Sequence, residues 1–238
     1  MKRFAILSIA LAAASMSHAA EIYNNGPVVG ANGRSVIGAG QTTFGFSMST
    51  ARDSVVADDF IIAAGSRWTL SSIDFFGYQT GAAGFTFQEA SWSIVAASPN
   101  SPVVLASGTT GLTNGGLAGY RVNSAAQHLT NRGIYRAQAD VADFSLDAGH
   151  YYLRWSLSGS ASSGPWQAPV ADWRSGNAGQ SSGGDEFLKL VDAGSGATVE
   201  LPFSLHGSVS AVPEPETYGM MLAGLALVGA MARRRKQA

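Results

Sequence analysis

The amino-acid sequence predicts an all-β body, and its composition and patterning give three reasons. Of the 238 residues, 46% are hydrophobic and only 13% are charged, so the chain lacks the residues that build exposed helix faces. Apolar residues recur at every second position, most clearly at Val199, Leu201, Phe203 and Leu205, which is typical of a half-buried strand. Turn signals rich in glycine, such as Asp147-Ala148-Gly149, separate these runs.

The alternating runs predict about nine strands. In chain order the ranges are 55–62, 67–78, 85–96, 103–107, 119–123, 133–141, 151–157, 186–191 and 199–209. Without a convincing helix in the body, these strands indicate an antiparallel β-sandwich that is jelly-roll-like, with a barrel as the alternative. The segment Gly26–Gly45 lacks the lysine and the following helix of a phosphate loop, and we interpret it as a mobile lead-in strand.

Two positions predict irregular strands. The apolar set changes phase between Leu70 and Ile73, which indicates a β-bulge near Ser71-Ser72. Pro202 lies within the last run, where a missing N–H group restricts the strand to an edge or a bulge.

The chain divides into three predicted segments. Residues 1–19 have a basic start, an apolar run and small residues before the expected cleavage site after Ala19, which is the pattern of a secretory signal peptide. Residues 20–210 form the β-sandwich body. Residues 211–238 contain a Pro-Glu-Pro motif at 212–216, an apolar segment at 218–232 that is expected to form a hydrophobic helix, and a basic stop at 233–236.

This tail resembles a known sorting signal. The stretch Val212, Pro213, Glu214, Pro215 and Glu216, the apolar segment and the cluster Arg233, Arg234, Arg235 and Lys236 occur in the order of the PEP-CTERM motif of Gram-negative bacteria. The resemblance implies recognition and cleavage by an exosortase, in species that make exopolysaccharide, and some ice-binding proteins carry the same type of tail. A plain C-terminal membrane anchor is the alternative reading.

Charge and cysteine content exclude several function classes. Between Glu21 and Val212 the chain carries nine basic and fourteen acidic side chains, so no basic surface for nucleic acid is expected. The absence of cysteine excludes disulfides and a thiol nucleophile. We expect export by the Sec machinery, transient anchoring in the inner membrane, and then a place at the cell surface or in the extracellular matrix.

Residues that could carry chemistry are sparse. The histidines of the body, His128, His150 and His206, lie far apart in the sequence and form no metal-ligand pair or hydrolase motif. The carboxylates Asp58-Asp59 and Asp140, Asp143 and Asp147 suggest either a weak Ca²⁺ site or solvated strand ends, and we expect no cofactor. A secreted jelly-roll hydrolase that uses an Asp/Glu pair is the enzymatic alternative.

A long loop at 159–177 gives the better indication of binding. It holds Trp166 and Trp173, with Asp172, Arg174 and Asn177 as polar neighbours, and a sugar site needs such flat rings and hydrogen-bonding groups. Alternatively, both tryptophans fill the open end of the sandwich. The sequence therefore predicts a non-catalytic envelope or matrix protein with a candidate glycan site in this loop.

Overall fold

The computed structural model describes residues 19–160, 166–171, 176–212, 225 and 233. The described residues form thirteen strands and one short 3-10 turn, η1 (Thr50–Arg52). The strands are β1 (Ala20–Asn24), β2 (Arg34–Ile37), β3 (Gly45–Ser47), β4 (Ser54–Ile62), β5 (Ser66–Gly77), β6 (Phe87–Ala96), β7 (Val104–Asn123), β8 (Gly133–Leu146), β9 (Gly149–Gly159), β10 (Gln167–Pro169), β11 (Gly179–Ser182), β12 (Leu188–Lys189) and β13 (Phe203–Ala211).

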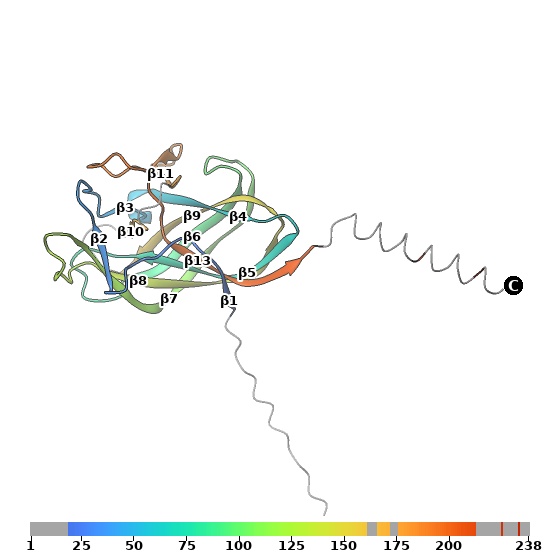
Figure 1. Ribbon diagram of the computed structural model, residues 1–238, viewed down its shortest axis with the longest axis horizontal. Coiled ribbons are helices and arrows are strands. Elements are labelled where there is room, and N and C mark those ends of the chain that lie inside the picture. The colour runs from blue at the N-terminus through green and yellow to red at the C-terminus, as the bar shows by residue number, and fades with distance from the viewer. Residues whose placement is uncertain (1–18, 161–165, 172–175, 213–224, 226–232, 234–238) are drawn as a thin grey trace, which may run out of the picture.

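Strands β3 and β10 form a small two-stranded sheet, and a larger curled, mainly antiparallel sheet organises the body. Its strands follow the order β1-β13-β5-β8-β7-β6-β9-β4-β11-β12, and β2 adds to β7 in parallel. The first half of β7 pairs with β6 and the second half with β8, so this long strand connects the two halves of the sheet. The halves face one another across one core, which gives the sandwich-like all-β fold expected from the sequence (Figure 1).

Aromatic side chains from both halves meet in this core. Trp155 of β9 is fully buried, with ring centroids 5.9 Å from Phe75 of β5 and 5.8 Å from Phe203 of β13. Phe60 of β4 stacks on Trp68 of β5 at 6.0 Å. Burial of such rings contributes the largest share of the stability of a disulfide-free domain.

The predicted irregularities are present, with differences in detail. The register of β5 against β8 shifts between Leu70 and Ser72, as the phase change predicted. Pro202 directly precedes β13, which is an interior strand between β1 and β5, and the bulge of this strand lies at His206 and Gly207. The edge alternative for the last strand was therefore wrong, because β1 covers the side that the sequence left open.

Two features of the strand prediction also need correction. The ranges 103–107 and 119–123 belong to one strand, β7, because Asn114-Gly115-Gly116 forms a register shift against β8 and does not reverse the chain. The predicted lead-in segment contains β2, which pairs with β7 from Arg34↔Tyr120 to Ile37↔Asn123. The short strands β1, β3, β10 and β11 have no clear alternation in the sequence.

The two ends of the body differ in what they carry. Strand β2 lies at one end of the long axis, on the left of Figure 1, and the last residues of β13 lie at the other. The chain enters the predicted sorting segment from β13, where the Val212 N–H donates to the Gly65 carbonyl at 2.8 Å.

Candidate functional site

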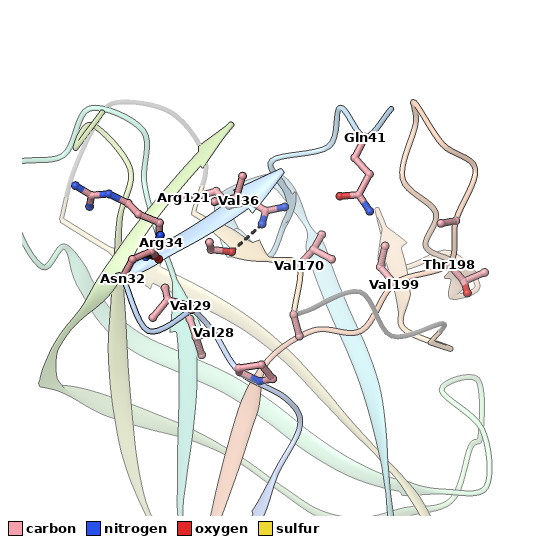
Figure 2. Close-up of a pocket in the computed structure, with 15 residues that line it drawn as sticks. Val28, Val29, Asn32, Arg34, Val36, Gln41, Arg121, Val170, Thr198 and Val199 are labelled. Carbon is pink, nitrogen blue, oxygen red and sulfur yellow. Dashed lines mark hydrogen bonds between the residues drawn. The ribbon is translucent and has the colours of Figure 1, made fainter. Parts of the chain in front are cut away.

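A cavity of about 410 Å³ lies beside β2 and β7 (Figure 2). Its walls are mainly apolar and come from segments that are distant in the sequence, while arginine, amide and hydroxyl groups supply the polar part. The lining residues are Pro27, Val28, Val29, Gly30, Asn32, Arg34, Ser35, Val36, Gln41, Arg121, Val170, Ala171, Ala197, Thr198 and Val199. We call this space the Arg121 cavity. Its volume falls within the range of small-molecule sites, roughly 300–1,000 Å³.

Local backbone features place β2 against β7. Gly33 turns the chain with a φ of 69°, in the left-handed region that favours glycine. At Gly119, a Cβ atom would lie 2.5 Å from the Gly33 carbonyl oxygen and 2.7 Å from Val29. Glycine at 119 therefore permits the close approach of the 29–33 turn, and the parallel pairing sets Ser35 opposite Arg121.

Arg121 is the buried cation of this cavity, with 4% of its surface exposed. Its Nε donates to the Phe44 carbonyl at 2.8 Å, one Nη donates to Ser35 Oγ at 2.8 Å, and the other donates to the Thr43 carbonyl at 3.1 Å. Burial lowers the pKa of Arg121 to about 10, so the side chain stays charged at neutral pH. Among the described residues, no carboxylate forms an ion pair with it.

Asp192 fixes the backbone loop that Arg121 touches. Its Oδ1 accepts hydrogen bonds from the N–H groups of Thr42 and Thr43 at 3.0 and 2.8 Å, and its Oδ2 accepts from Ser195. Burial alone would raise the pKa of Asp192, but the hydrogen bonds from Thr43, Ser195 and Thr42 hold it well below its ordinary range. The loop at 42–44 is therefore held by a carboxylate on one side and the guanidinium on the other.

A second polar centre surrounds Asp58 on β4. The carboxylates of Asp58, Asp59 and Glu200 have oxygens within 4.8 Å of one another. Asp58 Oδ2 accepts from Leu201 N at 2.6 Å and from Asn25 Nδ2 at 2.9 Å, while Oδ1 accepts from Asp59 N at 2.9 Å. We call Asp58, Glu200, Asn25 and the Leu201 N–H the Asp58 centre.

The Asp58 centre has the geometry of a structural anchor. Asp58 has no exposed surface, and both of its oxygens already accept hydrogen bonds from the protein. Burial, and then the Glu200 carboxylate, raise the pKa of Asp58 well above its ordinary range. Ca²⁺ prefers six to eight oxygen ligands, so an ion bound here would have to displace protein donors from Asp58.

Among the remaining described candidates for chemistry, only His150 lies beside the carboxylates of Asp58, Asp59 and Glu200. Asp140, Asp143 and Asp147 are exposed along β8 and its following turn, and Asp147 pairs with Arg67 at 3.5 Å. His128 is exposed. His150 Nε2 lies 2.5 Å from Asp59 Oδ2, and His206 Nε2 lies 3.0 Å from Oδ2 of the buried Asp74.

The predicted glycan loop is described only in part. Trp166 is 6% exposed and belongs to the main core, where its Nε1 donates to Thr86 Oγ1 at 2.9 Å. Asn177 is partly buried, and its Oδ1 has no hydrogen-bond partner within the described segments. Asp172, Trp173 and Arg174 lie outside the described residues, so the glycan site stays a prediction. In the chain they directly follow Val170 and Ala171, which line the Arg121 cavity.

Sequence reasoning did not identify Arg121. An isolated arginine in a strand has no signature of burial, and its partners Ser35, Thr43 and Phe44 are nearly 80 residues away or more. One signal was available: Arg121 lies between the apolar residues Tyr120 and Val122 in a chain that is poor in charge. A cation in such a run requires an internal acceptor for its N–H groups.

The sorting tail lies mostly outside the described residues. Val212 is described and exposed, as is Arg233, whereas Pro213, Glu214, Pro215, Glu216, Arg234, Arg235 and Lys236 are not described. The same holds for nearly all of the predicted hydrophobic helix at 218–232, and for the signal segment up to residue 18. Within the described part of the chain, no helix has the length and apolar character needed to cross a membrane.

Comparison with known proteins gives one match. Residues 211–236 match the PEP-CTERM protein-sorting motif. No curated protein and no solved structure matches the chain. The match begins at Ala211, the last residue of β13. The chain therefore carries the sorting signal of an exosortase substrate, and it is an exported, surface-directed protein.

Proposed function

We propose that this protein is a non-catalytic component of the cell envelope or extracellular matrix, delivered there by exosortase processing of its tail. The observation that carries the proposal is the PEP-CTERM match at 211–236, which begins at the last residue of β13. In this proposal the apolar segment at 218–232 retains the precursor in the inner membrane, and the extended Pro-Glu-Pro stretch presents the site of recognition.

Two tail variants test the sorting proposal. Deletion of Tyr218–Ala238 should release the body to the periplasm or the medium, because the deletion removes the C-terminal membrane affinity. Replacement of Pro213-Glu214-Pro215 by three alanines should instead cause a full-length, membrane-bound precursor to accumulate. Gln237→Ala, one residue beyond the match, is the control and should be processed normally. Unchanged processing of the triple-alanine variant in cell fractions would contradict recognition of the motif.

We further propose that the body contacts polysaccharide through the segment that contains Asp172, Trp173, Arg174 and Asn177. Support comes from the indole, carboxylate, guanidinium and amide groups of this segment, which suit stacking on a sugar ring and hydrogen bonds to its hydroxyls. Trp166 has a separate, structural role in this proposal, since its ring is buried.

The two tryptophans provide a matched test of the polysaccharide proposal. Trp173→Ala should weaken binding severalfold at unchanged melting temperature, because loss of a stacked ring removes about 0.5–1.5 kcal/mol. Trp166→Ala should lower the free energy of unfolding by about 3–5 kcal/mol, as expected for a large-to-small change in a core. Glycan-array binding and thermal melts of the full chain measure both effects. An unchanged glycan affinity in Trp173→Ala would disprove the assignment of this segment.

A further inference from the structure

The Arg121 cavity combines an apolar enclosure with a buried positive charge. Its walls include Val28, Val29, Val36, Val170 and Val199, which Figure 2 shows around the same space as Arg121. Of the described residues that line it, two are arginines and none is acidic. Arg34 also belongs to the lining, with its guanidinium carbon 4.6 Å from the centre of the Tyr120 ring. The described lining therefore carries positive and no negative side-chain charge, while the Asp192 carboxylate lies behind the loop at 42–44.

The hydrogen bonds of Arg121 leave donor capacity unused. A guanidinium has five N–H groups, and the three described bonds to Phe44, Ser35 and Thr43 occupy one on each nitrogen. One N–H group therefore remains on each terminal nitrogen. Two N–H groups on a planar fork match the two oxygens of a carboxylate, and such charge-assisted pairs are strong where water is excluded.

We propose that the Arg121 cavity binds a small organic carboxylate with an apolar body. The carboxylate accepts the two remaining N–H groups of Arg121, and the apolar body lies against the valine walls. Asn32 and Gln41 lie on the lining as polar groups for any hydroxyl of the ligand. The acid is either a free molecule or an acidic unit of a polymer, since both present the same carboxylate. This inference does not depend on the sorting tail.

The valine side chains of the cavity favour a carboxylate with an apolar body over other anions. Phosphate and sulfate are strongly hydrated, and their transfer to a site lined by valines costs more than the two remaining N–H groups can offset. A neutral ligand of the same shape would leave the two remaining N–H groups of Arg121 without a charged acceptor. A carboxylate attached to a ring or a short aliphatic group meets both requirements.

Two ligand pairs test the chemistry by isothermal titration calorimetry on the full chain in mild detergent. Benzoate is compared with benzamide, which has the same shape without the charge, and glucuronate is compared with glucose. We expect saturable binding of at least one carboxylate, with affinity lower by about tenfold or more for its neutral counterpart. Binding of benzoate alone indicates a free acid as the source, and tighter binding of an oligouronate than of glucuronate indicates a polymer.

Three variants test whether the carboxylate binds in the Arg121 cavity. Val36→Trp should abolish this binding by filling the space, whereas Val209→Trp, on an exposed part of β13, adds the same bulk elsewhere and should leave it intact. Arg121→Lys keeps a charge but loses the planar fork, and should weaken binding about tenfold. Thermal melts of each variant establish that it is folded.

Three outcomes would overturn the proposal. The first is the absence of saturable binding for benzoate, glucuronate and oligouronate. The second is binding that persists in a folded Val36→Trp variant. The third is sulfate binding as tight as that of the best carboxylate, which would indicate a general anion site.

Discussion

The body contains two buried ionisable groups that differ in how completely the protein satisfies their hydrogen bonds. Asp58 is a carboxyl group whose two oxygens accept three hydrogen bonds from protein N–H groups, and it has no exposed surface. Arg121 is a cation with three hydrogen bonds and two N–H groups left over, beside a cavity. A buried ionisable group is costly unless its hydrogen bonds are satisfied. The N–H groups that the protein leaves unused on Arg121 therefore distinguish it from Asp58.

The difference indicates what each centre contributes. The Asp58 centre connects β4, the segment after β1 and the segment before β13, because its donors come from Asn25 and Leu201. It stabilises the fold, because both Asp58 oxygens already accept hydrogen bonds from the protein. Arg121 also holds a loop, through Thr43 and Phe44, but its remaining donors lie beside space that a ligand of suitable size fills. The hydrogen bonds of Asp58 all come from the protein and stabilise the fold. Arg121 stabilises a loop and also keeps two N–H groups that a ligand in the cavity can use.

A matched pair of truncations tests this comparison. We expect its effect on the free energy of unfolding to be the largest of the stability effects predicted below. Asn25→Ala removes one of the two donors to Asp58 Oδ2 and also leaves the buried Leu201 carbonyl without the amide that donates to it. We expect it to reduce the free energy of unfolding by about 2–3 kcal/mol. Ser35→Ala removes an acceptor from Arg121, where water in the cavity can replace the hydroxyl, and should cost about 0.5–1.5 kcal/mol.

Urea denaturation of the full chain and both variants at neutral pH measures the two values. Ser54→Ala, which removes a buried hydroxyl that donates to the Arg52 carbonyl away from both centres, serves as the control for the loss of an ordinary hydrogen bond. An equal loss in the free energy of unfolding for Asn25→Ala and Ser35→Ala would contradict the comparison, because it would mean that water does not replace the Ser35 hydroxyl.

How far the sequence predicts the molecule depends on the range of the interactions. Strands β4, β5, β6, β8 and β9 were predicted because each carries its own alternation, and the bulge near Ser71-Ser72 was predicted from a local change of phase. Strand β2 was not predicted, because its four residues form a strand only through pairing with β7, more than 80 residues away.

The candidate sites follow the same rule. The Asp58-Asp59 pair was visible as adjacent carboxylates, but Glu200 and Asn25 reach it only in the folded chain. The Arg121 cavity is made of segments that share no motif, so no local pattern could predict it. The sorting tail is the opposite case, because a processing enzyme recognises a linear segment and all of its features are therefore local in sequence.

The last prediction concerns pH and has the smallest expected effect. The pKa of Asp58 is raised in the folded state by burial and by Glu200, so the folded protein binds a proton that the unfolded chain, with an ordinary carboxyl pKa near 3.9, releases. The Asp58 contribution to stability is therefore fully present below that unfolded pKa and is lost as the pH rises through the folded pKa. The contribution of Asp192 to stability has the opposite pH dependence, because its folded pKa is lowered. The comparison is therefore made between variants, so that this contribution cancels. Asp58→Asn, which cannot titrate, should lack the Asp58 contribution, so its stability relative to the unchanged chain should improve as the pH rises above about 4. Urea denaturation of both proteins across this range measures the difference, and a constant difference at every pH would mean that Asp58 titrates alike in the folded and unfolded chains.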